Sequence, residues 1–137
     1  FNEIIKSFKL EERNDEERAI KDTAIQKATL NAIKIPLKVM EVSLDSMNLI
    51  EDLVKIGNPN SISDVGVAGL CARSAVLGAH LNVIINAKDY SNKKDRSELL
   101  KKAEEIKNKA IKKETSIIEK TLEGIKNSSW IKWKGGQ

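Results

Sequence analysis

The chain has 137 residues and a formal net charge of +4, and it is 40% hydrophobic and 32% charged. This composition is typical of one soluble, globular helical domain with its own core. Aromatic residues make up only 4%, which argues against stacking platforms for single-stranded nucleic acid, and basic and acidic residues are mixed rather than clustered. We expect no nucleic-acid or membrane partner, since no uninterrupted apolar run is long enough to span a bilayer, and a cytoplasmic location.

The two residue types that most often bind metals are almost absent. A lone Cys71 rules out an internal disulfide, and His80 has no other soft ligand with which to complete a zinc site. We therefore expect no metal site.

The predicted fold is an all-α helical bundle with a long kinked helix and a central buried helix. Its first helix ends near Leu10 and places Phe1, Ile4, Ile5 and Phe8 on one face. Because a natural chain seldom opens inside a helix, we expect residues 1–137 to form a single domain that lacks its N-terminal segment.

The second helix is predicted over residues 15–55 and carries two apolar stripes at helical spacing. Two stripes that lie alongside each other indicate a wide buried face with more than one neighbour. Pro36 has no backbone N–H, so a kink or a break is expected there. The first stripe is Ile33, Leu37, Met40, Leu44, Met47 and Val54, and the second is Ile35, Val39, Val42, Leu49 and Leu53.

The third helix is predicted over residues 63–87. Its own apolar residues lie on all sides of the helix, so it should be the central helix of the bundle. Arg73, His80 and two asparagines argue against a transmembrane helix. Arg73 is expected to meet a carboxylate or an interface, and His80 to be an interior or interface histidine rather than a catalytic base.

One stripe of the third helix is small or polar at every position. It permits either tight packing, with Asn82 and Asn86 bonded to neighbouring backbone, or space for a ligand. Asp64 and Asn82 lie roughly 27 Å apart along a straight helix, so they serve opposite ends of a long ligand or different sites across a subunit interface if both are functional. The stripe is Asp64, Ala68, Cys71, Ala75, Gly78, Ala79, Asn82 and Asn86.

After a polar connection at residues 87–94, the last helix is predicted over residues 95–126 with a solvated Lys/Glu face. Its apolar residues also form two stripes. Residues 128–137 lose the helical pattern, and their two tryptophans suit either docking on a partner subunit or a frayed end. The stripes are Leu99, Ala103, Ile106, Ala110 and Ile117, and then Ile111, Ile118, Leu122 and Ile125.

The run 57–68 (GNPNSISDVGVA) holds more polar groups than a helix start requires. Ser61 or Ser63 is expected to cap the third helix by accepting from a free backbone N–H. Asp64 then lies in the first turn, where a negative charge suits the helix dipole. No phosphate loop, metal spacing or catalytic triad accompanies this run, so the residues alone leave capping and a small-molecule site as alternatives.

Three stretches in order, 1–10 (FNEIIKSFKL), 57–68 and 81–86 (LNVIIN), resemble the cyclodeaminase family. This family comprises the helical domain of formiminotransferase-cyclodeaminase and its single-domain microbial relatives, and the likeness is expected to reach about Lys126. Val65 stands where an alanine is usual. The family's Gly/Ser-rich front segment, which is expected to line the folate pocket, is not among residues 1–137.

The resemblance implies a tetrahydrofolate derivative as substrate and a homodimer or larger homo-oligomer. It implies that formimino-tetrahydrofolate closes to methenyl-tetrahydrofolate with release of ammonia, which needs a base and an acid but no cofactor. Asp64 is the candidate for acid–base catalysis. The substrate-binding candidates are Asn58, Asn60, Ser61, Ser63, Asn82 and Asn86. The alternatives are a methenyltetrahydrofolate cyclohydrolase and a non-catalytic helical interaction module.

Overall fold

The computed structural model describes residues 2–127, which are helical apart from short connections and contain no strand. The elements are α1 (Asn2–Phe8), α2 (Asp15–Ile56), a 3₁₀ turn (Pro59–Ser61), α3 (Ile62–Ala87) and α4 (Lys93–Asn127). The predicted all-α bundle is confirmed. The expected docking of the tryptophan-containing tail lies outside the described residues.

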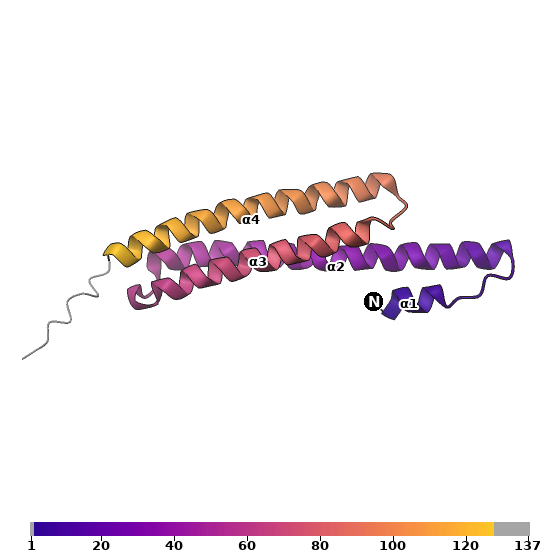
Figure 1. The fold of residues 1–137 in the computed structure, drawn as a ribbon, viewed down its shortest axis with the longest axis horizontal. Coiled ribbons are helices and arrows are strands. Elements are labelled where there is room, and N and C mark those ends of the chain that lie inside the picture. Colours follow the sequence, from indigo (N-terminus) through magenta and orange to yellow (C-terminus); the bar gives the residue numbers. More distant parts are fainter. Residues whose placement is uncertain (1, 128–137) are drawn as a thin grey trace, which may run out of the picture.

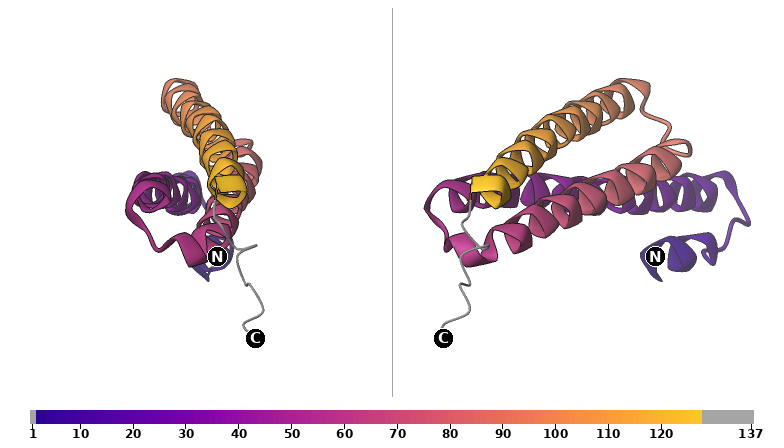
Figure 2. Two further views of the ribbon diagram at one scale, coloured as in Figure 1. Left: turned by 90° about the vertical axis from the view of Figure 1, so that its left-hand side faces the viewer. Right: turned by 60° about the vertical axis from the view of Figure 1, so that its left-hand side comes forward.

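Helices α2, α3 and α4 pack together, whereas α1 lies beside the N-terminal half of α2, beyond the end of α3 (Figure 1). The end-on view of Figure 2 shows α2 to one side of α3 and α4. Helix α3 contacts both neighbours and is central, as predicted. The apolar face expected for the first helix is not buried, because α1 packs through Ser7 and leaves Ile5 and Phe8 exposed.

Helix α2 begins at a capping residue and runs without interruption through Pro36. The Asn14 side chain accepts from the Glu17 N–H at 2.8 Å, which satisfies one free donor of the first turn. At Pro36 the missing N–H would have paired with the Ala32 carbonyl, four residues earlier. The Asn86 side chain of α3 donates to that carbonyl at 2.8 Å instead. Of the kink or break expected at Pro36, the break is therefore wrong, since α3 satisfies the acceptor that the proline leaves free; the kink stays a prediction.

Close approach of α3 and α4 depends on two glycines in α3. A Cβ atom added to Gly66 would lie 2.8 Å from Cγ2 of Thr121, and one added to Gly69 would lie 3.0 Å from Cγ2 of Ile117. Ile117 is fully buried. Glycine thus allows the first turns of α3 to lie directly against the last third of α4, closing the core at this end.

The core forms from the first predicted stripe of α2 and the first predicted stripe of α4, together with Val76 and Val83 of α3. The second stripe of α2 is not buried, contrary to prediction: Ile35 and Leu49 are 67% and 65% exposed. At 100° per residue the two stripes lie on nearly opposite sides of the helix. One side already faces α3 and α4, so the other faces outward.

The prediction that α3 is buried on all sides is also wrong. Its outward residues Val67 and Leu81 are 56% and 67% exposed. The helical stretch Pro59–Ala87 is long and apolar enough to cross a membrane by length and composition, with a mean hydropathy of 1.4, and 33% of its most apolar window is buried. The core helix of a soluble bundle and a spanning helix share these properties.

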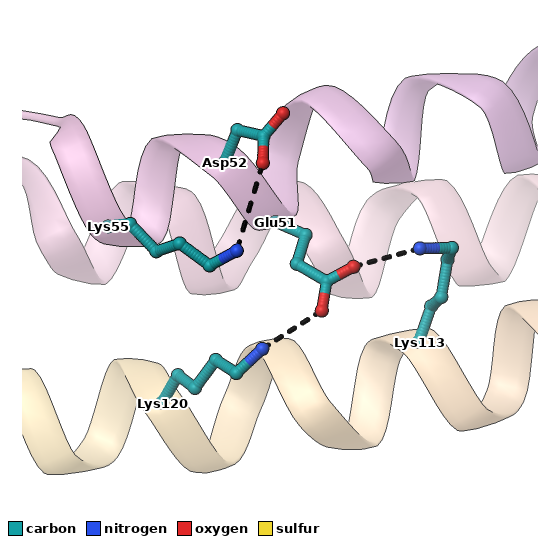
Figure 3. Close-up of polar contacts among 5 residues, drawn as sticks. All are labelled: Glu51, Asp52, Lys55, Lys113 and Lys120. Carbon is teal, nitrogen blue, oxygen red and sulfur yellow. Dashed lines mark hydrogen bonds and ion pairs between the residues drawn. The ribbon is translucent and has the colours of Figure 1, made fainter.

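A carboxylate on α2 is held by two lysines of α4, as Figure 3 shows. Glu51 accepts from Lys113 at 2.8 Å and from Lys120 at 2.9 Å. These two hydrogen bonds, Lys113 first, lower the pKa of Glu51 to about 2. The two lysines lie about two turns apart on one face of α4, so they hold the carboxylate from both sides.

The low pKa of Glu51 predicts acid sensitivity. The folded-state value of about 2 lies below the ordinary value of 4.5, so ionised Glu51 stabilises the fold above pH 4.5, and this stabilisation is lost as the pH falls toward 2. Because both lysines are partly exposed, we expect Glu51→Gln to lower the free energy of unfolding by about 1–2 kcal/mol at pH 6 and much less at pH 2. Urea titrations at the two pH values measure this. Glu105→Gln, at an exposed position of α4, is the control, and an equal loss at both pH values would contradict the prediction.

Candidate functional site

The connection between α2 and α3 is built from turn chemistry. An added Cβ at Gly57 would lie 2.5 Å from the Leu53 carbonyl oxygen, so only glycine ends α2 in this way. The Asn58 side chain then accepts from the Asn60 N–H at 3.0 Å, and the Asn58 carbonyl accepts from the Ser61 N–H at 2.9 Å. The polar run therefore forms a 3₁₀ turn with Asn58 as its cap.

The expected serine cap is wrong. Ser61 occupies the N-cap position of α3 without a side-chain cap bond, and Ser63 lies inside the first turn. The Ile62 N–H donates to the Pro59 carbonyl, so the 3₁₀ turn passes directly into α3 and satisfies a donor that a serine would otherwise serve.

Asp64 is an exposed carboxylate in the first turn of α3. Within residues 2–127 its side chain has neither an ion pair nor a hydrogen bond. Asn60, Ser61 and Ser63 are exposed beside it. These groups gather at one end of α3, where the helix N-terminus favours a negative charge, and they are open to solvent rather than enclosed.

A cavity of about 260 Å³ lies behind the connection, between the ends of α2 and α4. Asn58 is the one candidate that lines it, together with Lys55, Ile62 and Asn127. Asp64 and the two serines lie outside it. Asn58 therefore lines the cavity, whereas the other candidate residues of the run 57–68 lie on the adjoining surface.

Asn82 and Asn86 differ in role. Asn86 is half-buried and bonds to the Ala32 carbonyl of α2, as the packing alternative predicted. Asn82 is exposed, and its side chain has no hydrogen bond to the described residues. Of the two, Asn82 remains available to a ligand or partner.

The role of Asn86 beside Pro36 is testable by a double-mutant cycle. Asn86→Ala leaves the Ala32 carbonyl unpaired, and we expect it to lower the free energy of unfolding by about 1–2 kcal/mol. In a Pro36→Ala background, the restored backbone N–H of residue 36 donates to the Ala32 carbonyl. Asn86→Ala should therefore lower the free energy of unfolding by about 1 kcal/mol less in that background than in the wild-type chain. Denaturant titration of the four proteins measures the coupling. Equal costs in the two backgrounds would show that Asn86 does not replace the proline donor.

Two further polar contacts join α3 to α4. Arg73 donates to the buried Glu114 at 3.2 Å, which confirms the expected carboxylate partner. His80 is 8% exposed, as expected for an interior histidine, and its Nε2 lies 3.3 Å from Glu104. The sequence signalled that Arg73 needs a partner, but nothing in the sequence identified a glutamate 41 residues away. Among the described residues no group of three or more His, Cys, Asp or Glu side chains could hold a metal ion.

Comparisons with known proteins agree with the family resemblance that the sequence analysis based on the polar run 57–68 and two further stretches. The family model described as formiminotransferase-cyclodeaminase matches residues 1–105, less than the expected extent to about Lys126. The chain is 36% identical over 104 residues to a methenyltetrahydrofolate cyclohydrolase of Methylorubrum extorquens, covering 76% of this chain and 50% of that protein. It is 32% identical over 92 residues to formimidoyltransferase-cyclodeaminase of Rattus norvegicus (67% and 17%).

The Dictyostelium discoideum formimidoyltransferase-cyclodeaminase is 35% identical over 98 residues, covering 66% of this chain and 18% of that protein. The chain thus spans half the length of the first relative and less than a fifth of the other two. The family match covers more than three quarters of the chain, from α1 into α4, and includes the whole polar connection. The chain therefore belongs to the formiminotransferase-cyclodeaminase family.

Proposed function

We propose that the protein is a folate enzyme that closes formimino-tetrahydrofolate to methenyl-tetrahydrofolate and releases ammonia. Family membership and the names of the relatives support this substrate class. The observation that carries the proposal is Asp64, an exposed carboxylate without an intramolecular partner in residues 2–127, beside the polar connection.

In the proposed reaction, one folate nitrogen attacks the formimino carbon and loses a proton. The carbon–nitrogen bond to the formimino nitrogen breaks, and that nitrogen leaves as ammonia after it is protonated. In this proposal Asp64 accepts the first proton and returns one to the leaving nitrogen. Asn60, Ser61 and Ser63 supply hydrogen-bonding groups beside it, and Asn58 supplies one from the cavity behind the connection. These steps exchange one carbon–nitrogen bond for another with proton transfers and no change of oxidation state, so the proposal includes no redox cofactor and asks for no metal.

The second candidate is a methenyltetrahydrofolate cyclohydrolase. It is favoured by the 36% identity to the Methylorubrum extorquens protein, of which this chain covers the larger share. The two reactions share methenyl-tetrahydrofolate, which is the product of the cyclodeaminase and the substrate of the cyclohydrolase. They differ in nitrogen chemistry, since hydrolysis releases no ammonia.

An assay of both substrates separates the candidates. With formimino-tetrahydrofolate we expect ammonia and the methenyl chromophore to appear in equal amounts, and with methenyl-tetrahydrofolate we expect slower loss of the chromophore. Rapid hydrolysis without ammonia release from the formimino compound would instead establish the cyclohydrolase. Absence of both activities and of saturable binding of a reduced folate would identify a non-catalytic helical module.

A further inference from the structure

A groove lies between α1 and the N-terminal half of α2, two helices that run side by side in Figure 1. It consists of two cavities of about 320 and 530 Å³ that share Glu3 and Asn31. Both volumes fall within the range of small-molecule sites, about 300–1,000 Å³. Lys34 in this groove and Gly57 in the polar connection lie roughly 35 Å apart along α2, so the groove is separate from the site proposed for folate.

Four lysines line the groove against one acidic side chain, Glu3. Lys6 belongs to α1, whereas Lys27, Lys34 and Lys38 follow one another on α2 at intervals of seven and four residues. At 100° per residue these three share an arc of about 40° on one side of the helix. Within residues 2–127 three of the four lysines have no ion pair, and Lys38 pairs on the surface with a neighbouring glutamate of its own helix. The groove therefore presents positive charge that the described side chains do not neutralise.

The lysines are divided between the two cavities in pairs. Lys6 and Lys27 line the smaller cavity, and Lys34 and Lys38 line the larger one. The midpoint of the second pair is nine residues beyond Lys27, which is roughly 14 Å along α2, and the flexible side chains can shorten this separation to about 10 Å. The arrangement suits a ligand with two separated anionic groups rather than one.

The part of the groove between the two lysine pairs is polar. Glu3 and Asn31 line both cavities, and the Asn31 amide donates to the Glu3 carboxylate at 3.4 Å. This contact uses one amide N–H and one carboxylate oxygen. Within residues 2–127, the other N–H, the amide carbonyl and the second carboxylate oxygen remain available, and together they can donate to and accept from hydroxyl groups.

The type of cation favours phosphate over carboxylate. The planar guanidinium of arginine matches a carboxylate with two parallel hydrogen bonds, whereas the lysine ammonium is a compact point charge that commonly binds phosphate. Among the described residues that line the two cavities, every cation is a lysine. A phosphate group carries nearly two negative charges at neutral pH, so each lysine pair matches one phosphate in charge.

We propose that this groove binds a sugar bisphosphate, a small molecule with a phosphate at each end and hydroxyl groups between them. One phosphate lies between Lys6 and Lys27 and the other between Lys34 and Lys38, while the middle of the groove binds the hydroxyls. The adjoining cavity beyond Lys34 is lined by two carboxylates, those of Asp95 and Glu98. Their negative charge confines an anionic ligand to the groove.

The first test is isothermal titration calorimetry with a hexose bisphosphate that carries phosphates on its two terminal carbons, at constant ionic strength. We expect saturable one-to-one binding, and we expect Lys27→Gln and Lys34→Gln each to weaken it by at least about tenfold, because each removes a charge-assisted hydrogen bond. Glutamine keeps a high helix propensity, and circular dichroism verifies folding.

The matched controls are Lys109→Gln and Lys112→Gln. Both lysines are exposed on α4 and have no ion pair within residues 2–127, so these variants lose the same net charge away from the groove. They should change the dissociation constant by less than about twofold, since distant exposed charges are screened. Absence of saturable binding to the wild-type protein, or equal effects of groove and control variants, overturns the proposal.

Other probes test each part of the assignment. A hexose monophosphate and inorganic pyrophosphate should each bind at least about tenfold more weakly, because neither reaches both lysine pairs. A straight-chain alkane bisphosphate of the same span should also be weaker, because it lacks hydroxyls. Pyrophosphate that binds as tightly as the sugar bisphosphate overturns the two-ended site, and an equally tight alkane bisphosphate overturns the role of the polar middle. A dicarboxylate of the same span that binds as tightly overturns the phosphate assignment. These measurements need neither folate nor turnover, so they decide the groove independently of the proposed function.

Discussion

Turnover of formimino-tetrahydrofolate by Asp64→Asn is expected to fall by a factor of about 100 or more, the usual contribution of a positioned acid–base group. Asparagine keeps the size of the side chain and caps helices as well as aspartate does, so the fold should be unaffected. The measurement is the initial rate of ammonia release at saturating substrate, with far-ultraviolet circular dichroism to verify folding.

The matched control is Asp15→Asn. Asp15 is also an exposed aspartate in the first turn of a helix, α2, and its one ion pair, to Arg18 at 3.5 Å, is exposed. Both substitutions remove one negative charge near a helix N-terminus, an effect of about 0.3–1 kcal/mol on stability. If Asp64→Asn and Asp15→Asn both retained normal turnover, Asp64 would be a dipole-stabilising residue without an acid–base role.

Ile117→Ala should cause the largest loss of stability, about 3 kcal/mol. The Ile117 side chain is fully buried and lies against Gly69 of α3, so truncation removes apolar contacts and leaves a cavity between α3 and α4. Thermal and urea unfolding measure the change. For a bundle of this size this is a large fraction of the total stability.

Leu122→Ala is the control on the same helix, since Leu122 is 52% exposed. It should cost less than about 1 kcal/mol, because most of the side chain is already in water. Equal losses for the two variants would mean that the α3–α4 contact does not close the core.

The helices were predictable because their signals are local. Asn14 and Gly57 mark the two ends of α2, and the stripe from Ile33 to Met47 repeats at the helical period, so boundaries and the buried side follow from neighbouring residues. Pro36 left a kink and a break open for the same reason: its local effect is a lost donor, whereas Asn86, which compensates for that loss and keeps α2 continuous, lies 50 residues further along the chain on another helix.

The candidate site was predictable in composition but not in arrangement. Asn58 and Asp64 are close in sequence and both lie at the start of α3, yet one lines a cavity and the other faces solvent. Apolar periodicity also cannot tell a core face from a face that awaits a partner, since both remove the same side chains from water. The second stripe of α2 was therefore interpreted as core and is exposed.

The lysine pair that holds Glu51 lies on the part of α4 beyond residue 105, where the family match ends. The same stretch supplies Glu114 to Arg73 and Ile117 to Gly69. The part of α4 beyond the family match therefore supplies contacts to α2 and α3 that the matched segment does not contain. A protein cut at residue 105 would retain the polar connection but would expose the side of α2 and α3 that this part of α4 covers, so a boundary drawn from sequence similarity alone would divide the described bundle.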